Sequence, residues 1–134
     1  MDANPRKSRG TGERASAAVE FALVLPLVLI MGLALLQVGL LVKDQLVLQG
    51  SARAGARQGA VSTDDAEVRQ AAIDAAASLD TEHLEVSVRR EGGGGSPVTV
   101  VTVYHAPLIV PLVDWLFPSV VDLAASAVMR QETG

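Results

Sequence analysis

The chain has 134 residues, a formal net charge of −4 and no cysteine, and only 3% of its residues are aromatic. The acidic balance and the lack of a basic patch with interleaved aromatic residues argue against binding to nucleic acid. The absence of cysteine excludes disulfide frameworks and thiolate metal sites. Roughly 75 C-terminal residues are few for a self-sufficient core, so we expect them to pack against another element or a partner.

Residues 1–15 form a polar, mainly basic segment. Its cations outnumber its acids, Asp2 and Glu13, and are Arg6, Lys7, Arg9 and Arg14. The composition predicts a disordered segment. Excess positive charge before an apolar run also predicts that the N-terminus stays in the cytoplasm and that the C-terminal domain lies outside.

An uncharged run of 22 residues, Phe21–Val42, comes next. A helix of this length at ~1.5 Å per residue spans roughly 33 Å, close to the ~30 Å hydrocarbon core of a bilayer. We therefore predict a transmembrane helix over residues 21–42. Glu20 directly precedes this run. A carboxylate at this position is costly unless it lies near the interface or has a partner. That cost makes Glu20 the first candidate for a functional residue.

The apolar run contains residues that bear on helix packing. Pro26 removes a backbone hydrogen bond and kinks a helix, which membrane helices tolerate better than soluble ones. Gly32 and Gly39 lie seven residues apart on nearly the same helical face, where they allow another backbone to approach closely. Gln37 lies near that face and could form a hydrogen bond across helices. These positions suggest association with other helices.

Three interpretations compete for the N-terminal segment. A cleaved signal peptide requires a shorter apolar core followed by a small-x-small site, and no such site follows this run. A plain signal anchor fits the length and the charge but does not explain Glu20. A leader of the type IV prepilin kind is cut before the apolar segment. If Glu20 is the fifth residue of the mature chain, the cut falls between Ala15 and Ser16, and Ala15 replaces the glycine that prepilin peptidases prefer.

The helix is predicted to continue past the apolar run to residue 60. Small residues recur four apart, giving a smooth face for close packing; they are Gly50 and Ala54, and Ala52 and Ala56. Arg53 and Arg57 have the same spacing and form one positive ridge. This ridge could contact an acidic partner surface or lipid headgroups, or it could be solvated and paired with acids of its own domain.

The remaining residues predict one helix and about three strands. Ser62–Asp65 is a good helix start, because acids in the first turn complement the helix dipole; the helix should end near residues 78–80. Alternating residues after His83, the β-branched stretch Val98–Ala106, and Val121–Arg130 predict strands. The Gly-rich segment 92–97 predicts a hairpin loop between the first two. The apolar segment 106–123 is predicted to be a connector that helps to cover the sheet, or an exposed patch that docks a partner or the membrane surface.

No catalytic or metal-binding constellation is evident in the sequence. His83 and His105 are the only histidines, and each is expected at a strand edge without a metal-ligand partner at motif spacing. No serine has the context of a nucleophile elbow. We therefore expect no enzymatic activity, no cofactor and no small-molecule substrate.

Residues 13–60 resemble the TadE-like family, the minor pseudopilins of Tad (tight adherence, Flp) pilus systems. The matching parts are SAAVEFALVLP at residues 16–26, the polar break at Gln37, and SARAGARQGA at residues 51–60; AASAVMRQE at residues 124–132 also resembles the closing strand of the family. The resemblance implies processing by a prepilin peptidase and a role in pilus assembly. Glu20, with Phe21 beside it, would then set the helix in place against neighbouring subunits.

The sequence thus predicts an α+β protein with three parts: a cytoplasmic leader (1–15), a long helix (16–60) with a transmembrane span (21–42), and a small extracytoplasmic domain (61–134). Its partners would be the membrane, other pilin or pseudopilin subunits, the pilus assembly platform and a prepilin peptidase. The alternative is a single-pass, signal-anchored domain that binds an extracellular ligand and takes no part in a filament. Loss of assembly after Glu20→Ala would distinguish the two.

Overall fold

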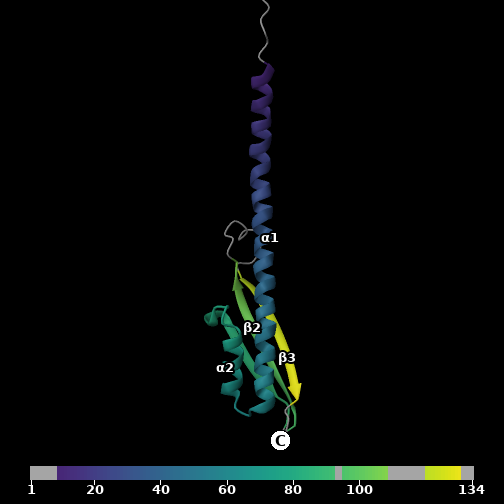
Figure 1. The fold of residues 1–134 in the computed structure, drawn as a ribbon, viewed down its shortest axis with the longest axis vertical. Helices are drawn as coiled ribbons and strands as arrows, with labels where there is room; N and C mark the ends of the chain where they lie inside the picture. Colours follow the sequence, from purple (N-terminus) through teal and green to yellow (C-terminus); the bar gives the residue numbers. More distant parts are fainter. Residues whose placement is uncertain (1–8, 93–94, 109–119, 131–134) are drawn as a thin grey trace, which may run out of the picture. The chain divides into compact units, whose positions relative to one another are not determined.

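The computed structural model of the protein describes residues 9–92, 95–108 and 120–130 (Figure 1). In chain order, the elements are α1 (Arg9–Val61), α2 (Asp65–Ala75), the short 3-10 helix η1 (Thr81–His83), β1 (Leu84–Arg90), β2 (Pro97–Pro107) and β3 (Val120–Arg130). The strands form one antiparallel sheet in the order β1-β2-β3. The predicted α+β class, with a long helix, one further helix and three antiparallel strands, is confirmed.

The chain forms two compact units, Met1–Leu36 and Gln37–Gly134, and α1 contributes residues to both. α1 begins at Arg9 rather than at the predicted Ser16, so residues 9–15, which were expected to be disordered, are helical. The physical reason is that no proline follows Pro5 before this stretch, and adding residues to an established helix costs little compared with starting one.

The second unit is built around the central strand β2. Alternate β2 side chains are buried on the face that packs against the helices, and these are Val98, Val100, Thr102, Tyr104 and Ala106. β1 pairs with one side of β2, with Leu84 opposite Tyr104, and β3 pairs with the other. Gly92 and Gly95, in the connection between β1 and β2, have positive φ angles of 101° and 90°. The predicted strands and the Gly-rich hairpin are therefore confirmed.

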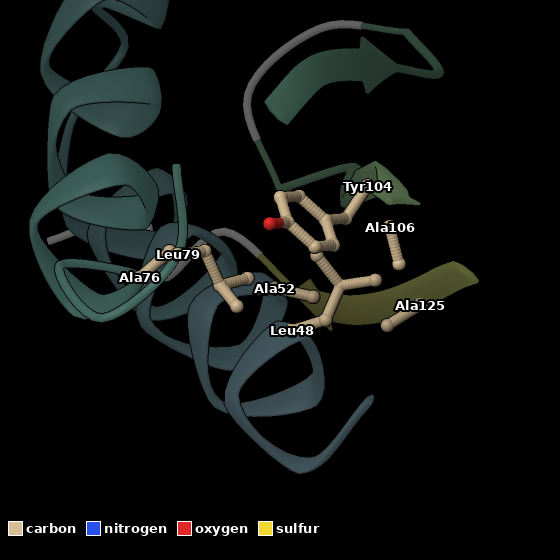
Figure 2. Close-up of a cluster of buried hydrophobic side chains, with 7 residues drawn as sticks. All are labelled: Leu48, Ala52, Ala76, Leu79, Tyr104, Ala106 and Ala125. Atoms are coloured by element: carbon tan, nitrogen blue, oxygen red, sulfur yellow. The ribbon is translucent and has the colours of Figure 1, made fainter. Parts of the chain in front are cut away.

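The core of this unit combines α1, α2 and the sheet. Figure 2 shows Leu48 reaching from α1 to the ring of Tyr104 and toward Ala125 of β3. The same cluster contains Ala52, Ala76, Leu79 and Ala106, and a second cluster contains Ala56, Val68, Val98 and Val100. The hydroxyl of Thr102 lies 3.3 Å from the Leu48 carbonyl oxygen. The small domain thus obtains its core by packing on α1, as its size led us to expect.

Two glycines let α1 lie directly on its neighbours. A Cβ atom at Gly55 would lie 3.1 Å from the Cβ of Ala72 and 3.1 Å from Cγ1 of Val100. A Cβ atom at Gly59 would lie only 2.8 Å from Cγ1 of Val98. Side chains larger than hydrogen therefore do not fit at these two positions without movement of α2 or β2.

Helix α2 begins where the sequence predicted. Asp64 is the N-cap, and its side chain accepts a hydrogen bond from the Ala66 amide at 2.8 Å. The helix ends at Ala75, earlier than predicted, because the amide of Ala76 bonds the Ile73 carbonyl three residues back and begins a tighter turn. On the α1 side, the Ser51 hydroxyl donates to the Ala72 carbonyl at 2.7 Å, which fixes the two helices along each other.

Arg90, at the end of β1, connects the sheet to the end of α1 and the start of α2. Its Nε lies 2.8 Å from Oδ1 of Asp65, and its Nη2 donates to the Ser62 carbonyl at 3.0 Å. A longer bond of 3.4 Å reaches the Gly59 carbonyl. A cation at the C-terminal carbonyls of α1 and the first turn of α2 satisfies acceptors that helix ends leave open.

Part of the predicted connector, residues 109–119, lies outside the described residues, so neither of its interpretations is tested. The same holds for residues 1–8 of the leader and for the last residues of the AASAVMRQE segment.

We predict that Gly59→Ala lowers the free energy of unfolding of the domain by up to about 2 kcal/mol. Overpacking in a close-packed core costs about 1–3 kcal/mol, and the better helix propensity of alanine returns only about 1 kcal/mol. Gly50→Ala is the matched control, because a Cβ there meets nothing within 4 Å. It should stabilise the domain by up to about 1 kcal/mol. Pulse proteolysis of the full chain in detergent with increasing denaturant measures both; equal effects would contradict the close packing.

Candidate functional site

The N-terminal part of α1 presents an apolar surface that nothing in the described chain covers. Its large side chains are mostly exposed, with Leu23 at 74% and Leu27 at 67%. Within this helix, an 18-residue apolar window is entirely unburied. Among the described residues, α1 is the one helix that is long and apolar enough to cross a membrane. Water is a poor environment for such a surface, so it is suited to lipid or to other helices.

The predicted processing and registry residues all lie on this helix. Ala15 and Ser16 are helical and exposed, and Glu20 and Phe21 follow with exposed side chains. Glu20 is therefore the acidic group at the N-terminal border of an apolar surface, as the sequence indicated. A carboxylate in this position gains most when a cation of another chain approaches it out of water.

Proline does not end the helix. Pro26 lies inside α1, which continues through it to Val61. Because proline has no amide hydrogen, the carbonyl one turn earlier lacks its usual helical donor. The structure thus places a weakened backbone bond six residues after Glu20, within the apolar surface.

The predicted packing residues differ in how open they are. A Cβ atom at Gly32 or at Gly39 would meet nothing within 4 Å, so both glycines lie on open helix surface. Gln37, in contrast, is only 7% exposed. Its side chain is buried within the second unit, so it is less available to another helix than the two glycines are.

Arg53 and Arg57 line a shallow groove of about 470 Å³ on the outer side of α1. The other lining residues are Gly50, Ala54, Gln58 and Met129, the last from β3. Both arginines are exposed, and among the described residues neither lies within ion-pair distance of a carboxylate. The expectation that acids of the same domain pair with this ridge therefore does not hold for the described residues.

One comparison with known families gives a match, and it lies on this helix. Residues 15–57 match the family model described as TadE-like protein. The chain is similar to TadE-like proteins over these 43 of its 134 residues. The match confirms the resemblance drawn from the sequence. No curated protein and no solved structure matches the chain.

The TadE-like segment contains every site residue that the sequence singled out, from Ala15 to Arg57. The burial of its small residues explains the SARAGARQGA motif. Ser51, Ala52 and Ala56 are fully buried in the domain, and Gly55 packs against α2 and β2. The small residues of this motif thus hold the domain on its own helix, and the groove residues Gly50 and Ala54 remain on the outer surface.

A cluster outside the TadE-like segment was missed by sequence reasoning. His105 is not at a strand edge: it lies in the central strand β2, with Asp122 directly opposite on β3. Its Nδ1 is 2.6 Å from Oδ1 of Asp122, and its Nε2 is 3.7 Å from Oε1 of Glu85 on β1. The hydrogen bond to Asp122 raises the pKa of His105, and the charge of Glu85 adds to this effect. Only the sheet register, not sequence spacing, brings these three groups together.

His83 lies in η1, where its Nδ1 is 3.1 Å from Oδ2 of Asp80. Within the described residues, no group of three or more histidine, cysteine or acidic side chains is arranged to hold a metal ion. The histidines therefore contribute polar contacts on the domain surface.

We predict that the stability of the domain that contains the sheet falls as the pH rises through the pKa of His105. The pKa is raised in the folded state, so the stabilisation is fully present below the unfolded value of about 6.5 and is lost as the proton leaves. Denaturation midpoints of the full chain between pH 5.5 and about 8.5 test this. His105→Gln should flatten the dependence, whereas His83→Gln should leave most of it. An unchanged slope in His105→Gln would contradict the prediction.

Proposed function

We propose that this protein is a minor pseudopilin-like component of a Tad-type pilus assembly or secretion system. It is anchored in the cell membrane by one span, with its N-terminus in the cytoplasm and its domain outside. It acts through helix packing and protein–protein contacts, without catalysis and without a cofactor.

The observation that carries this proposal is the exposed apolar surface of α1 with one carboxylate at its start, inside the TadE-like segment. An anchor alone requires only the apolar surface. A carboxylate such as Glu20 raises the free-energy cost of placing the helix in lipid. Its presence therefore favours a role for this helix in addition to anchoring.

A specific partner for Glu20 follows from processing. Cleavage between Ala15 and Ser16 by a prepilin peptidase leaves a cationic α-amino group four residues before Glu20. When helices of several subunits pack, the Glu20 carboxylate of one can pair with the α-amino group of its neighbour. Each charge then offsets the burial cost of the other, and the pair sets one register between helices.

The open helix positions support packing against other subunits and the assembly platform. Gly32 and Gly39 allow another backbone to approach, and membrane helices associate through such small residues. Pro26 leaves a carbonyl without a helical donor, which favours a local adjustment of the helix during packing.

We predict that Glu20→Ala and Glu20→Gln abolish pilus assembly while the protein still inserts into the membrane. Removing one partner of a buried ion pair costs about 3–5 kcal/mol, which corresponds to a loss on the order of a hundredfold or more in association. Glu13→Gln is the matched control, because Glu13 belongs to the leader and is removed with it. Membrane fractionation measures insertion, and sheared pilus yield measures assembly.

The rival, a signal-anchored domain that binds an extracellular ligand, makes the opposite prediction. A pure anchor tolerates Glu20→Gln, or gains slightly from losing a carboxylate near lipid. Normal assembly in both Glu20 variants would therefore contradict the pseudopilin proposal and support the rival.

A further inference from the structure

The two helices of the domain carry charged rows of opposite sign, one row on each helix. α1 and α2 lie side by side on one face of the sheet (Figure 1). The α1 row consists of Arg53 and Arg57, which line the groove. The α2 row consists of Glu67 and Asp74, which are both exposed and, seven residues apart, lie on nearly the same face of α2.

The two rows lie at the same level along α1. Ala72 of α2 contacts the stretch at Gly55, between the two arginines, and Ser51 bonds its carbonyl. One turn further along α1, Nε2 of the groove residue Gln58 lies 3.3 Å from Oε2 of Glu67. The acidic row therefore flanks the same two turns of α1 that carry the arginines.

Among the described residues of one copy, no ion pair neutralises either row. Arg53 and Arg57 have no carboxylate within ion-pair distance in the described part of the chain. Glu67 accepts hydrogen bonds from Ser62 and Gln58, and Asp74 accepts one from Gln70. These donors are uncharged, so no cation of the described residues pairs with either carboxylate.

Lipid headgroups are a poor match for the groove. Arg53 lies eleven residues after Val42, the end of the apolar run, which corresponds to about 17 Å along the helix. The headgroup region extends only about 5–8 Å beyond the hydrocarbon core. The arginines thus lie beyond the headgroups when residues 21–42 span the bilayer.

We propose that two copies of this chain, anchored in one membrane, associate through this face about a two-fold axis along the membrane normal. Both copies then have the same orientation, so their charged rows meet at the same height. The two-fold rotation places the α2 of one copy opposite the α1 of the other. Arg53 and Arg57 of each copy face Glu67 and Asp74 of its partner, and the contact closes on itself. The inference rests on the membrane anchor of the proposed function.

Cysteine cross-linking in native membranes tests this directly, because the chain contains no cysteine. Two full-length copies with different tags are co-expressed, one with Ala54→Cys in the groove and the other with Gln70→Cys on the acidic row. A short bismaleimide should give a mixed-tag dimer. Its yield should fall in 1 M salt, where exposed charges are screened within about 3 Å. Absence of the dimer from inserted protein would overturn the proposal.

Charge exchange keeps the test independent of folding defects. Arg53→Glu with Arg57→Glu in both copies should lower the cross-linking yield about tenfold, since attractive pairs become repulsive. Pairing that copy with a Glu67→Arg and Asp74→Arg copy should restore the yield. Arg89→Glu, a charge reversal on the exposed side of β1, should have little effect. Equal loss in Arg89→Glu, or no restoration in the exchanged pair, would contradict the interface.

The outcomes separate this inference from the proposed function. Glu20→Gln should block pilus assembly but leave the mixed-tag dimer, because Glu20 lies outside the face. A cross-link lost in the Arg53 and Arg57 reversal and not recovered by exchange would point to a different acidic partner, and would overturn the contact between copies while the pilus role stands.

Discussion

The close contact between α1 and the sheet is the constraint on which the rest of the structure depends. At Gly59 an added Cβ would lie 2.8 Å from Val98, and Leu48, Ala52 and Ala56 are fully buried in the same helix. Val68 of α2 and Val98 and Val100 of β2 are buried in one cluster with Ala56 of α1. The domain therefore needs α1 as its main support, and any substitution that moves α1 away from β2 removes core from the whole unit.

This constraint gives one helix two different tasks. Near its N-terminal end α1 exposes large apolar side chains, whereas residues 48–60 carry small residues that face the domain. The TadE-like match, residues 15–57, covers both tasks. The proposed pseudopilin role would use both, because the apolar part is suited to packing with lipid or other helices and the same helix supports the domain.

Local patterns made much of the fold predictable. The alternation around Val86 and the β-branched stretch of β2 defined the strands, and Asp64 marked the start of α2. Long-range contacts were not predictable, because they depend on register and helix approach. Nothing in their spacing linked His105 to Asp122, or Met129 to the groove of Arg53. The buried role of Gly55 and Gly59 was also missed, although their separation of four residues within a small-residue motif was the available signal.

The central claim is that α1 is a processed, pilin-like helix whose mature chain begins near Glu20. The most direct measurement is the mature N-terminus, determined by mass spectrometry of protein from native membranes with and without the prepilin peptidase. The account predicts a peptide that begins at Ser16 and disappears without the peptidase. An intact leader in both samples would contradict it, and Glu20 would then need another explanation than pairing with a neighbouring α-amino group.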